Sequence, residues 1–231
     1  MMLFVRSAIF VVIVGALAGC GGGGSGLTTA NPLTAQRASV SGDTFNYSLT
    51  GTYSQTPLTQ NAATSGTATE VFTADTYNGQ TALQKTITTV FAENGSPTTL
   101  TDTTQYSAAG VALAQTDGSS IQAVTAGGFA ISPILSASTN ITATETLADG
   151  TTITLHYTVT GKTTITTPAG TFACWTATRT VAYSDGFSSS DTVDYAPSLG
   201  APVQETIQST YSGGLTLNLT SKLTSYTFGS F

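Results

Sequence analysis

Hydrophobic and polar residues alternate along most of the chain after residue 43. From Thr44, large apolar side chains recur at odd-numbered positions and polar residues stand between, as in Phe45, Tyr47, Leu49 and Tyr53. Side chains of a β-strand point alternately to its two faces, so this period of two predicts a strand with one buried and one wet face. The run from Thr81 to Ala92 repeats the pattern with Leu83, Ile87 and Phe91.

Asn-Gly and Asp-Gly pairs separate the alternating runs. Tyr77-Asn78-Gly79-Gln80 follows a run over 67–76, and Glu93-Asn94-Gly95-Ser96 precedes one over 98–106. Type I′ hairpin turns need positive φ at both central residues, which Asn and Gly tolerate best. Further strands are expected over 111–116, 120–125, 140–147 and 151–160, the last two joined at Asp149-Gly150. The first half of the chain therefore predicts an antiparallel meander.

The alternation of apolar and polar residues is interrupted at two places, and each interruption predicts a structural feature. No alternation is visible from Gly127 to about Thr139, so we expect a crossover between two halves near residues 126–138. The last strands are predicted over 203–211 and 215–228. Four inward leucines of the final run are odd-numbered but Tyr226 and Phe228 are even-numbered, so one extra residue near Thr224 would turn all six inward. That mismatch predicts a β-bulge.

Composition supports an all-β protein. Charged residues make up 8% of the chain, against roughly 25% in an average globular domain. Thr, Tyr, Phe and Val suit a pleated, half-buried surface, whereas strong helix formers are sparse. We therefore expect one antiparallel β domain over residues 43–231 with essentially no helix.

The first twenty residues have the layout of a secretory signal. One cation, Arg6, precedes an apolar run from Ala8 to Ala18 that is too short for a transmembrane helix. The sequence Leu17-Ala18-Gly19-Cys20 resembles the bacterial lipobox. This resemblance implies a signal peptide over residues 1–19 and lipid on Cys20, which would anchor the protein to a membrane.

A glycine-rich stretch follows the predicted lipidation site. Gly21 to Gly26 and the polar sequence after them predict a flexible tether over residues 20–42. In Gram-negative lipoproteins an aspartate directly after the lipidated cysteine is the usual signal for retention in the inner membrane. Gly21 occupies that position. The expected location is therefore the bacterial cell envelope, and the outer membrane if the source is Gram-negative.

A second motif lies near the middle of the C-terminal half. Thr167-Pro168-Ala169-Gly170-Thr171-Phe172-Ala173-Cys174 predicts two strands around a Pro-Ala-Gly turn. It resembles a Val-x-Val-Pro-Ala-Gly-Thr-Phe-x-Cys hairpin of uncharacterised bacterial envelope lipoproteins, and Tyr195-Ala196-Pro197-Ser198-Leu199-Gly200 resembles a second segment of theirs. The resemblance implies a single curved antiparallel sheet or a partly open β-barrel, like the half-barrels of lipoprotein carriers. It brings no catalytic residues.

Charge and candidate chemistry exclude several classes of function. The formal net charge is −6, and the five cations after the signal are scattered, so nucleic acid is not an expected partner. His156 is the single histidine, which excludes catalytic or metal schemes that need a second imidazole. Cys174 has no local cation to activate it and is expected to be a buried structural cysteine. Asp185, Asp191 and Asp194 match no ordered calcium motif and are expected to be solvated.

No catalytic, metal or cofactor site follows from these residues, and the protein is not expected to be an enzyme. The leading hypothesis is a membrane-anchored envelope lipoprotein whose curved sheet binds a lipid or another hydrophobic ligand. The motivation is the resemblance together with the one-sided apolar faces. The alternative is a structural or adhesive cell-surface module, indicated by charge-poor, threonine-rich strand faces.

Overall fold

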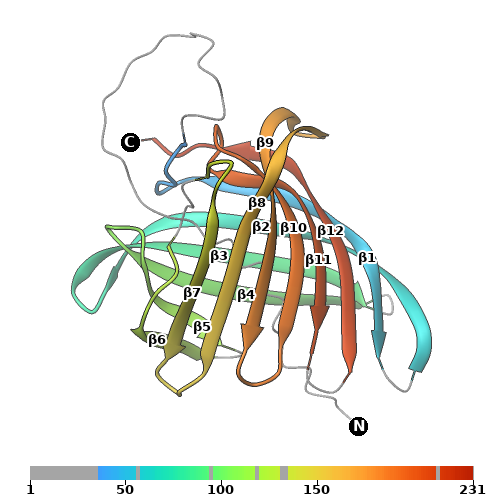
Figure 1. The fold of residues 1–231 in the computed structure, drawn as a ribbon, viewed down its shortest axis with the longest axis horizontal. Coiled ribbons are helices and arrows are strands. Elements are labelled where there is room, and N and C mark those ends of the chain that lie inside the picture. The colour runs from blue at the N-terminus through green and yellow to red at the C-terminus, as the bar shows by residue number, and fades with distance from the viewer. Residues whose placement is uncertain are drawn as a thin grey trace.

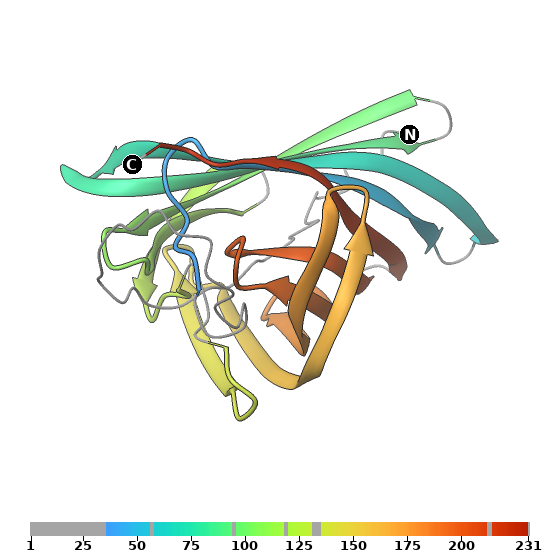
Figure 2. The same cartoon turned by 90° about the horizontal axis from the view of Figure 1, so that it is seen from above.

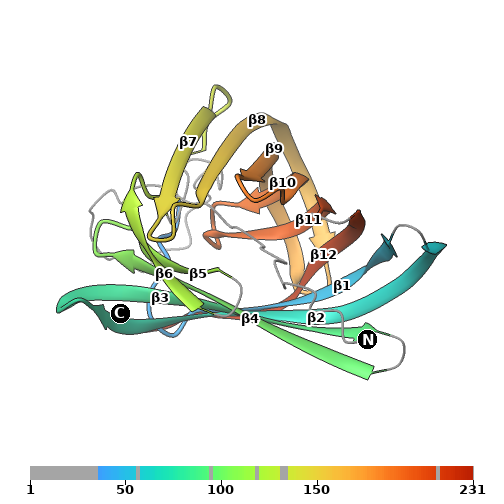
Figure 3. The same cartoon turned by 90° about the horizontal axis from the view of Figure 1, so that it is seen from below.

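The computed structural model describes residues 36–55, 58–93, 96–117, 120–130, 135–211 and 214–230. Within these ranges twelve antiparallel strands form a closed barrel and no helix occurs, so the all-β prediction is confirmed (Figures 1, 2 and 3). The strands are β1 (Thr44–Gln55), β2 (Leu58–Tyr77), β3 (Gln80–Glu93), β4 (Ser96–Ser107), β5 (Ala112–Asp117), β6 (Ser120–Ala126), β7 (Asn140–Leu147), β8 (Thr152–Thr167), β9 (Gly170–Tyr183), β10 (Ser188–Ala196), β11 (Ala201–Thr210) and β12 (Leu215–Thr227).

Each strand pairs with its neighbours in sequence, and the pairing of β1 with β12 closes the barrel. The two strands run antiparallel from the Thr44–Thr227 pair to the Gln55–Leu215 pair. A sheet that stayed open would leave unpaired backbone groups on these two long edges, and closure removes both edges. The sheet is therefore more fully closed than a half-barrel.

Alternation along the strands separates the barrel interior from the outer surface. On β8, Ile153, Leu155 and Tyr157 are buried, while His156 between them is exposed. On β1, the predicted inward face is buried in the same way, with Leu49 only 1% exposed. Burying each side chain of this size stabilises the fold by roughly 1.5–3 kcal/mol.

The buried apolar residues form three separate clusters. One joins β1, β11 and β12 with the tip of the β8–β9 hairpin, through Phe172 and Cys174. The second surrounds Phe129 and Tyr183. The third surrounds the single tryptophan, Trp175. A compact domain usually has one contiguous core, so the division indicates that other side chains lie between the clusters.

The β8–β9 hairpin changes its buried face along its length. The pairing register of β8 against β9 shifts between Val159 and Gly161. Strand β8 contacts β11 and β12, which are not its partners in the sheet, and Ile165 beyond the bulge packs against the cluster that contains residues of β11 and β12. Phe172 and Cys174 on β9 are buried there, although the outward residues of the same parity nearer the middle of β9, such as Thr178, are exposed. The tip of the hairpin therefore packs against residues of β11 and β12.

Most predicted turns and strands are present. Asn78 and Gly79 have φ angles of 50° and 78°, as the Asn-Gly prediction requires. The Asn94-Gly95 turn lies outside the described residues. Strand β2 begins at Leu58, earlier than the predicted 67, because the small and polar residues before Gly66 show no alternation.

Strand β10 was not predicted, and its sequence explains why. Its inward positions include Ser189 and Asp191, which are 6% and 3% exposed. Because polar residues occupy both faces of this strand, its sequence lacks the alternation of apolar and polar residues that predicts a strand. Strand β11 begins at Ala201, two residues before the predicted start. It can include Pro202 because the register of β10 against β11 shifts after Asp194, and proline is tolerated at such a bulge.

The predicted bulge near Thr224 is confirmed. Tyr47 pairs with Leu223 and Asn46 pairs with Ser225, which leaves Thr224 as the extra residue. The expectation that Tyr226 and Phe228 would then be buried is wrong, because they are 36% and 42% exposed. They lie at the end of β12 and beyond it, where their rings contact each other in a tilted arrangement with centroids 5.1 Å apart.

The connection between β6 and β7 takes a different form from the predicted crossover. These two strands are neighbours in the barrel, so the chain passes between adjacent strands here and the meander is continuous. Gly127 and Gly128 have φ angles of 75° and 125°, and Ala130 forms a β-bridge with Val111. The two halves therefore share one sheet.

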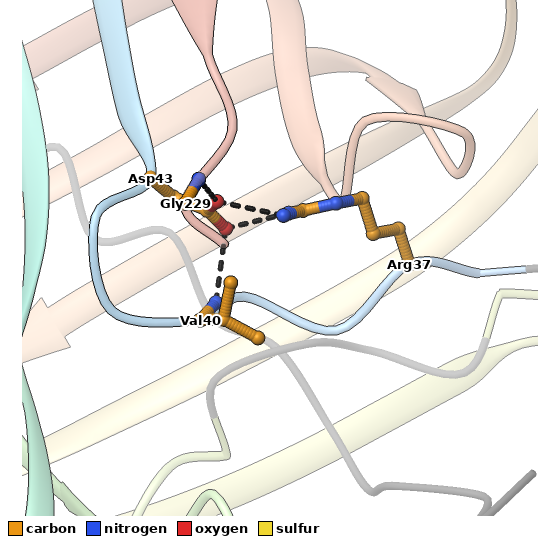
Figure 4. A network of polar contacts seen from close by, with 4 residues as sticks. All are labelled: Arg37, Val40, Asp43 and Gly229. Carbon is orange, nitrogen blue, oxygen red and sulfur yellow. Dashed lines mark hydrogen bonds and ion pairs between the residues drawn. The ribbon is translucent and has the colours of Figure 1, made fainter. Parts of the chain in front are cut away.

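A polar clasp joins the N-terminal segment to the C-terminal segment (Figure 4). The carboxylate of Asp43 is fully buried and accepts hydrogen bonds from both terminal nitrogens of Arg37, with Nη2 to Oδ1 at 2.6 Å. It also accepts from the backbone N–H groups of Val40 and Gly229, each at 2.9 Å. Residues 36–42, predicted as the end of the tether, are thus held against the barrel.

Candidate functional site

Among the described residues, a connected group of five buried acidic and basic side chains lies inside the barrel, and we refer to it as the charged belt. Each is at most 3% exposed. The belt consists of Glu70, Lys85, Arg179, Asp191 and Glu205. Removing such groups from water costs several kcal/mol each unless partners compensate, so their partners decide what the belt can do.

Arg179 is the centre of one half of the belt. Its Nε donates to Oδ2 of Asp191 at 2.8 Å, and its Nη2 lies 2.7 Å from the same oxygen. Nη2 also lies 3.6 Å from Oε1 of Glu205. The guanidinium therefore bridges two carboxylates, which raise its pKa against the opposing effect of burial.

The strand register brings these three residues together. Arg179 on β9 pairs directly with Asp191 on β10 and, on its other side, with Tyr157 on β8. Glu205 on β11 pairs with Val193, the next inward residue of β10. All occupy the parity of the buried apolar residues on their strands, so alternation alone turns them inward.

Glu70 and Lys85 form the other half of the belt, on β2 and β3. Burial raises the pKa of Glu70, and the nearby Lys85 opposes that rise. Lys85 also lies over the ring of Tyr106, 5.9 Å from its centroid. Asp102 on β4 faces the same lysine, and burial raises the pKa of its carboxyl to about 7.

The two halves of the belt act on each other across the barrel. Burial raises the pKa of Glu205 to about 7, with Arg179 lowering it and Asp191 and Glu70 raising it. Burial raises the pKa of Tyr47, and the nearby Glu70 and Glu205 raise it further. One electrostatic unit therefore extends from β9 to β3 through the interior.

Several polar atoms that point into the interior have no hydrogen-bond partner among the described residues. They are Glu70 Oε2, Thr89 Oγ1, Tyr157 Oη, Trp175 Nε1, Asp191 Oδ1 and Glu205 Oε1. A buried polar atom without a hydrogen bond costs about 1–3 kcal/mol. Clustering of such atoms is typical of a place that binds water or a ligand.

Glu145 lies apart from the belt, on β7. Its side chain is fully buried, and Oε2 accepts a hydrogen bond from the backbone N–H of Phe129 at 3.0 Å. Burial raises the pKa of this carboxyl to about 7, and the hydrogen bond opposes the rise. The hydrogen bond between Phe129 and Glu145 attaches the segment after β6 to β7.

The residues considered from sequence occupy different places. His156 is exposed and its Nδ1 lies 2.9 Å from Oγ1 of Thr142, as predicted for a solvent-facing strand residue. Cys174 is fully buried, and burial raises the pKa of its thiol to about 12. A thiol held protonated in this way is not a nucleophile.

The three aspartates do not form a common site. Asp185 is exposed, as expected, but the expectation of solvated side chains is wrong for Asp191 and Asp194. Asp191 faces the interior beside Arg179, and Asp194 faces the opposite side of β10 and accepts from Oγ1 of Thr176 at 2.7 Å. Across the described ranges, no three His, Cys, Asp or Glu residues are grouped as metal ligands would be.

The predicted lipidation site, Cys20, and the signal peptide lie outside the described residues. The part of the chain that the structure describes contains no helix long and apolar enough to cross a membrane.

No protein-family model matches the chain, and no curated protein matches it. Among solved structures, a candidate exported protein with a YmcC-like fold from Bacteroides fragilis aligns with 13% identity and a TM-score of 0.40, covering 84% of this chain and 99% of that one. A candidate lipoprotein from Parabacteroides distasonis aligns with 10% identity and a TM-score of 0.39, covering 84% and 98%. Likenesses this distant carry no inference about function.

Proposed function

We propose that this protein is a lipid-anchored lipoprotein of the bacterial cell envelope whose barrel binds a lipid or another hydrophobic ligand in its interior. The proposal gives the protein no catalytic role. The observation that carries it is the barrel interior, where apolar clusters flank a charged belt with unpartnered polar atoms.

The size of the barrel supports an interior ligand. Side chains just fill a barrel of about eight strands, and the diameter grows with the number of strands. The twelve strands of the described ranges exceed that number, which supports a wider interior than that of an eight-stranded barrel. A ligand with an apolar body and a polar group would contact both the apolar clusters and the belt.

The anchor and the location follow from the N-terminal sequence. Leu17-Ala18-Gly19-Cys20 supports lipidation at Cys20, and Gly21 supports export to the outer membrane in a Gram-negative cell. Lipid at Cys20 would hold the barrel at the membrane surface, where hydrophobic ligands are available.

Ligand extraction tests this proposal. The protein is purified from its own envelope, washed free of bulk lipid and analysed by mass spectrometry after solvent extraction. We expect one class of hydrophobic compound in stoichiometric amount. A protein that carries nothing beyond the lipid on Cys20 would contradict the proposal.

The outer surface favours a second candidate, a structural or adhesive surface module. Directly paired threonines continue across six neighbouring strands on the outward face, from β8 through β12 to β1, as Thr158, Thr178, Thr192, Thr206, Thr220 and Thr50. This row of hydroxyl and methyl groups carries no charge. Retention of the full chain on isolated cell-wall polysaccharide, lost when Thr192 and Thr206 become Lys, would favour this candidate over the ligand carrier.

A further inference from the structure

We infer that the charged belt selects a ligand whose polar group is a cationic hydrogen-bond donor, such as the primary ammonium of an amphiphile. This inference rests on the proposed function and specifies its ligand. It concerns the belt alone, and the apolar clusters would accept the body of any amphiphile.

The interior offers acceptors in excess of donors. Glu70, Asp191 and Glu205 each present a carboxylate oxygen without a hydrogen bond from the described residues. The two cations of the belt are already engaged: Arg179 contacts Asp191 and Glu205, and Lys85 interacts with Glu70 and Asp102. A ligand with N–H groups would donate hydrogen bonds to these carboxylate oxygens, which accept none from the described residues.

Charge points to the same class of ligand. Four buried or partly buried carboxyl groups face two cations in this region, counting Asp102 with the belt, so the region carries a negative excess once the carboxyl groups are ionised. An anionic head would add to the negative excess at low effective dielectric, whereas an ammonium group would balance it. Recognition therefore favours cations over anions.

Tyr157 gives a second indication, independent of the carboxylates. Its side chain is 3% exposed and pairs across the sheet with Arg179, yet its hydroxyl has no hydrogen-bond partner in the described ranges. A phenol oxygen is both donor and acceptor, so it can complete the shell around an ammonium group. It lies within the electrostatic reach of Arg179, Glu205 and Tyr195.

Titration of the belt should then control affinity. Glu205 faces Arg179 on β9, Asp191 on β10, and Glu70 and Lys85 across the interior, and the pKa of its carboxyl is about 7. Ionisation of this group as the pH rises through that value adds a negative charge. Binding of a cation should strengthen over the same interval, while binding of a neutral alcohol should not change.

The test compares three amphiphiles with one alkyl chain and different heads. The full chain carrying Cys20→Ser, which removes the lipid, is titrated calorimetrically with decylammonium and decanoate below their micelle concentrations and with decanol below its solubility limit. We expect saturable binding of one decylammonium per chain, about tenfold or more tighter than decanoate. Glu205→Gln and Glu70→Gln should each weaken decylammonium about tenfold, because the amide keeps an acceptor oxygen but removes the negative charge that attracts the ammonium group.

Asp185→Asn is the matched control. It removes one negative charge from an exposed turn and keeps the oxygen that accepts from the N–H of Phe187. It should leave decylammonium affinity unchanged, and melting temperatures report whether each variant folds.

The outcomes separate this inference from the proposed function. If decanoate binds as tightly as decylammonium, or if Glu205→Gln and Glu70→Gln fold without weakening the amine, the inference is overturned and the ligand-binding proposal stands. If none of the three amphiphiles binds, the ligand-binding proposal itself is overturned. Should one belt variant fail to fold, the other variant and the pH dependence of the parent decide.

Discussion

Arg179 and Asp191 form an ion pair inside the barrel, with side chains 2% and 1% exposed and Nη2 2.7 Å from Oδ2. The pair joins β9 to β10 at two positions that face the interior. Its position matters for stability, because neither charge can reach water if its partner is removed.

Breaking this pair should destabilise the fold strongly. Arg179→Met leaves Asp191 and Glu205 buried without their shared cation, so we expect a loss of about 3–5 kcal/mol. Urea unfolding followed by circular dichroism measures the change. Arg179→Met combined with Asp191→Leu should cost less than the sum of the single variants, because the double change also removes the uncompensated carboxylate. Additive losses would show that the pair is not coupled.

A control for that series lies on the outer surface. Lys222 is exposed on β12, so Lys222→Met removes a cation of similar length without touching the interior. Its effect should stay within about 0.5 kcal/mol.

Glu145 should make stability fall as the pH rises. The pKa of its buried carboxyl is about 7, so the folded state holds a proton that the unfolded chain releases near its ordinary pKa. This stabilisation is complete below the ordinary value and is lost as the pH rises through about 7. Glu145→Gln keeps an oxygen for the N–H of Phe129 and should be more stable than the parent by about 1–3 kcal/mol near pH 8.

The pH dependence of that difference is the decisive readout. Denaturant unfolding of parent and Glu145→Gln should converge near about pH 4, where both side chains are neutral. A constant difference between the two proteins across the pH range would contradict the assignment of the titration to Glu145.

The sequence predicted the fold class because most strands bury apolar side chains at alternate positions. Strands β1 and β8 follow this rule closely, and Asn78-Gly79 fixes the hairpin between β2 and β3. Closure could not be predicted from the pattern, because it depends on pairing between the first and last strands. That pairing is set by curvature of the whole sheet.

The charged belt was missed for a physical reason. From sequence, Arg179 is one of five scattered cations and Asp191 is expected to be solvated, since charged residues are rarely buried unless paired. The available signal was their parity: Arg179 stands between Ala177 and Val181, which are both inward on β9. A charge in phase with apolar neighbours indicates a buried ion pair, although its partner is known only once the strands are registered.

The β8–β9 hairpin should act as a folding element. Gly170 has a φ of 139°, which a β-branched residue adopts poorly, so Gly170→Val should cost about 1–3 kcal/mol. Phe172 is 9% exposed and meets Tyr226 edge to face, so Phe172→Ala should cost about 3–5 kcal/mol. Thermal unfolding measures both, with Thr164→Val on the exposed face as control. Variants as stable as the parent that lose ligand affinity would instead make this hairpin a binding element.

Lipidation should decide where the protein resides. The parent is expected in the outer-membrane fraction of a Gram-negative host. Cys20→Ser removes the acylated thiol, so the variant should appear as soluble protein or as uncleaved precursor. Membrane fractionation and metabolic labelling with a fatty acid follow both forms. Equal labelling and an equal distribution of parent and variant would rule out Cys20 as the anchor.

Quenching of Trp175 tests the interior binding site most directly. It is the single tryptophan, 5% exposed, and packs in the cluster with Tyr157 and Tyr195. Titration of the Cys20→Ser chain with an amphiphile brominated on its alkyl chain should quench its fluorescence saturably, because bromine quenches only at close contact. The midpoint should match the calorimetric affinity. Binding detected by calorimetry without any quenching would place the ligand outside the interior cluster and contradict this account.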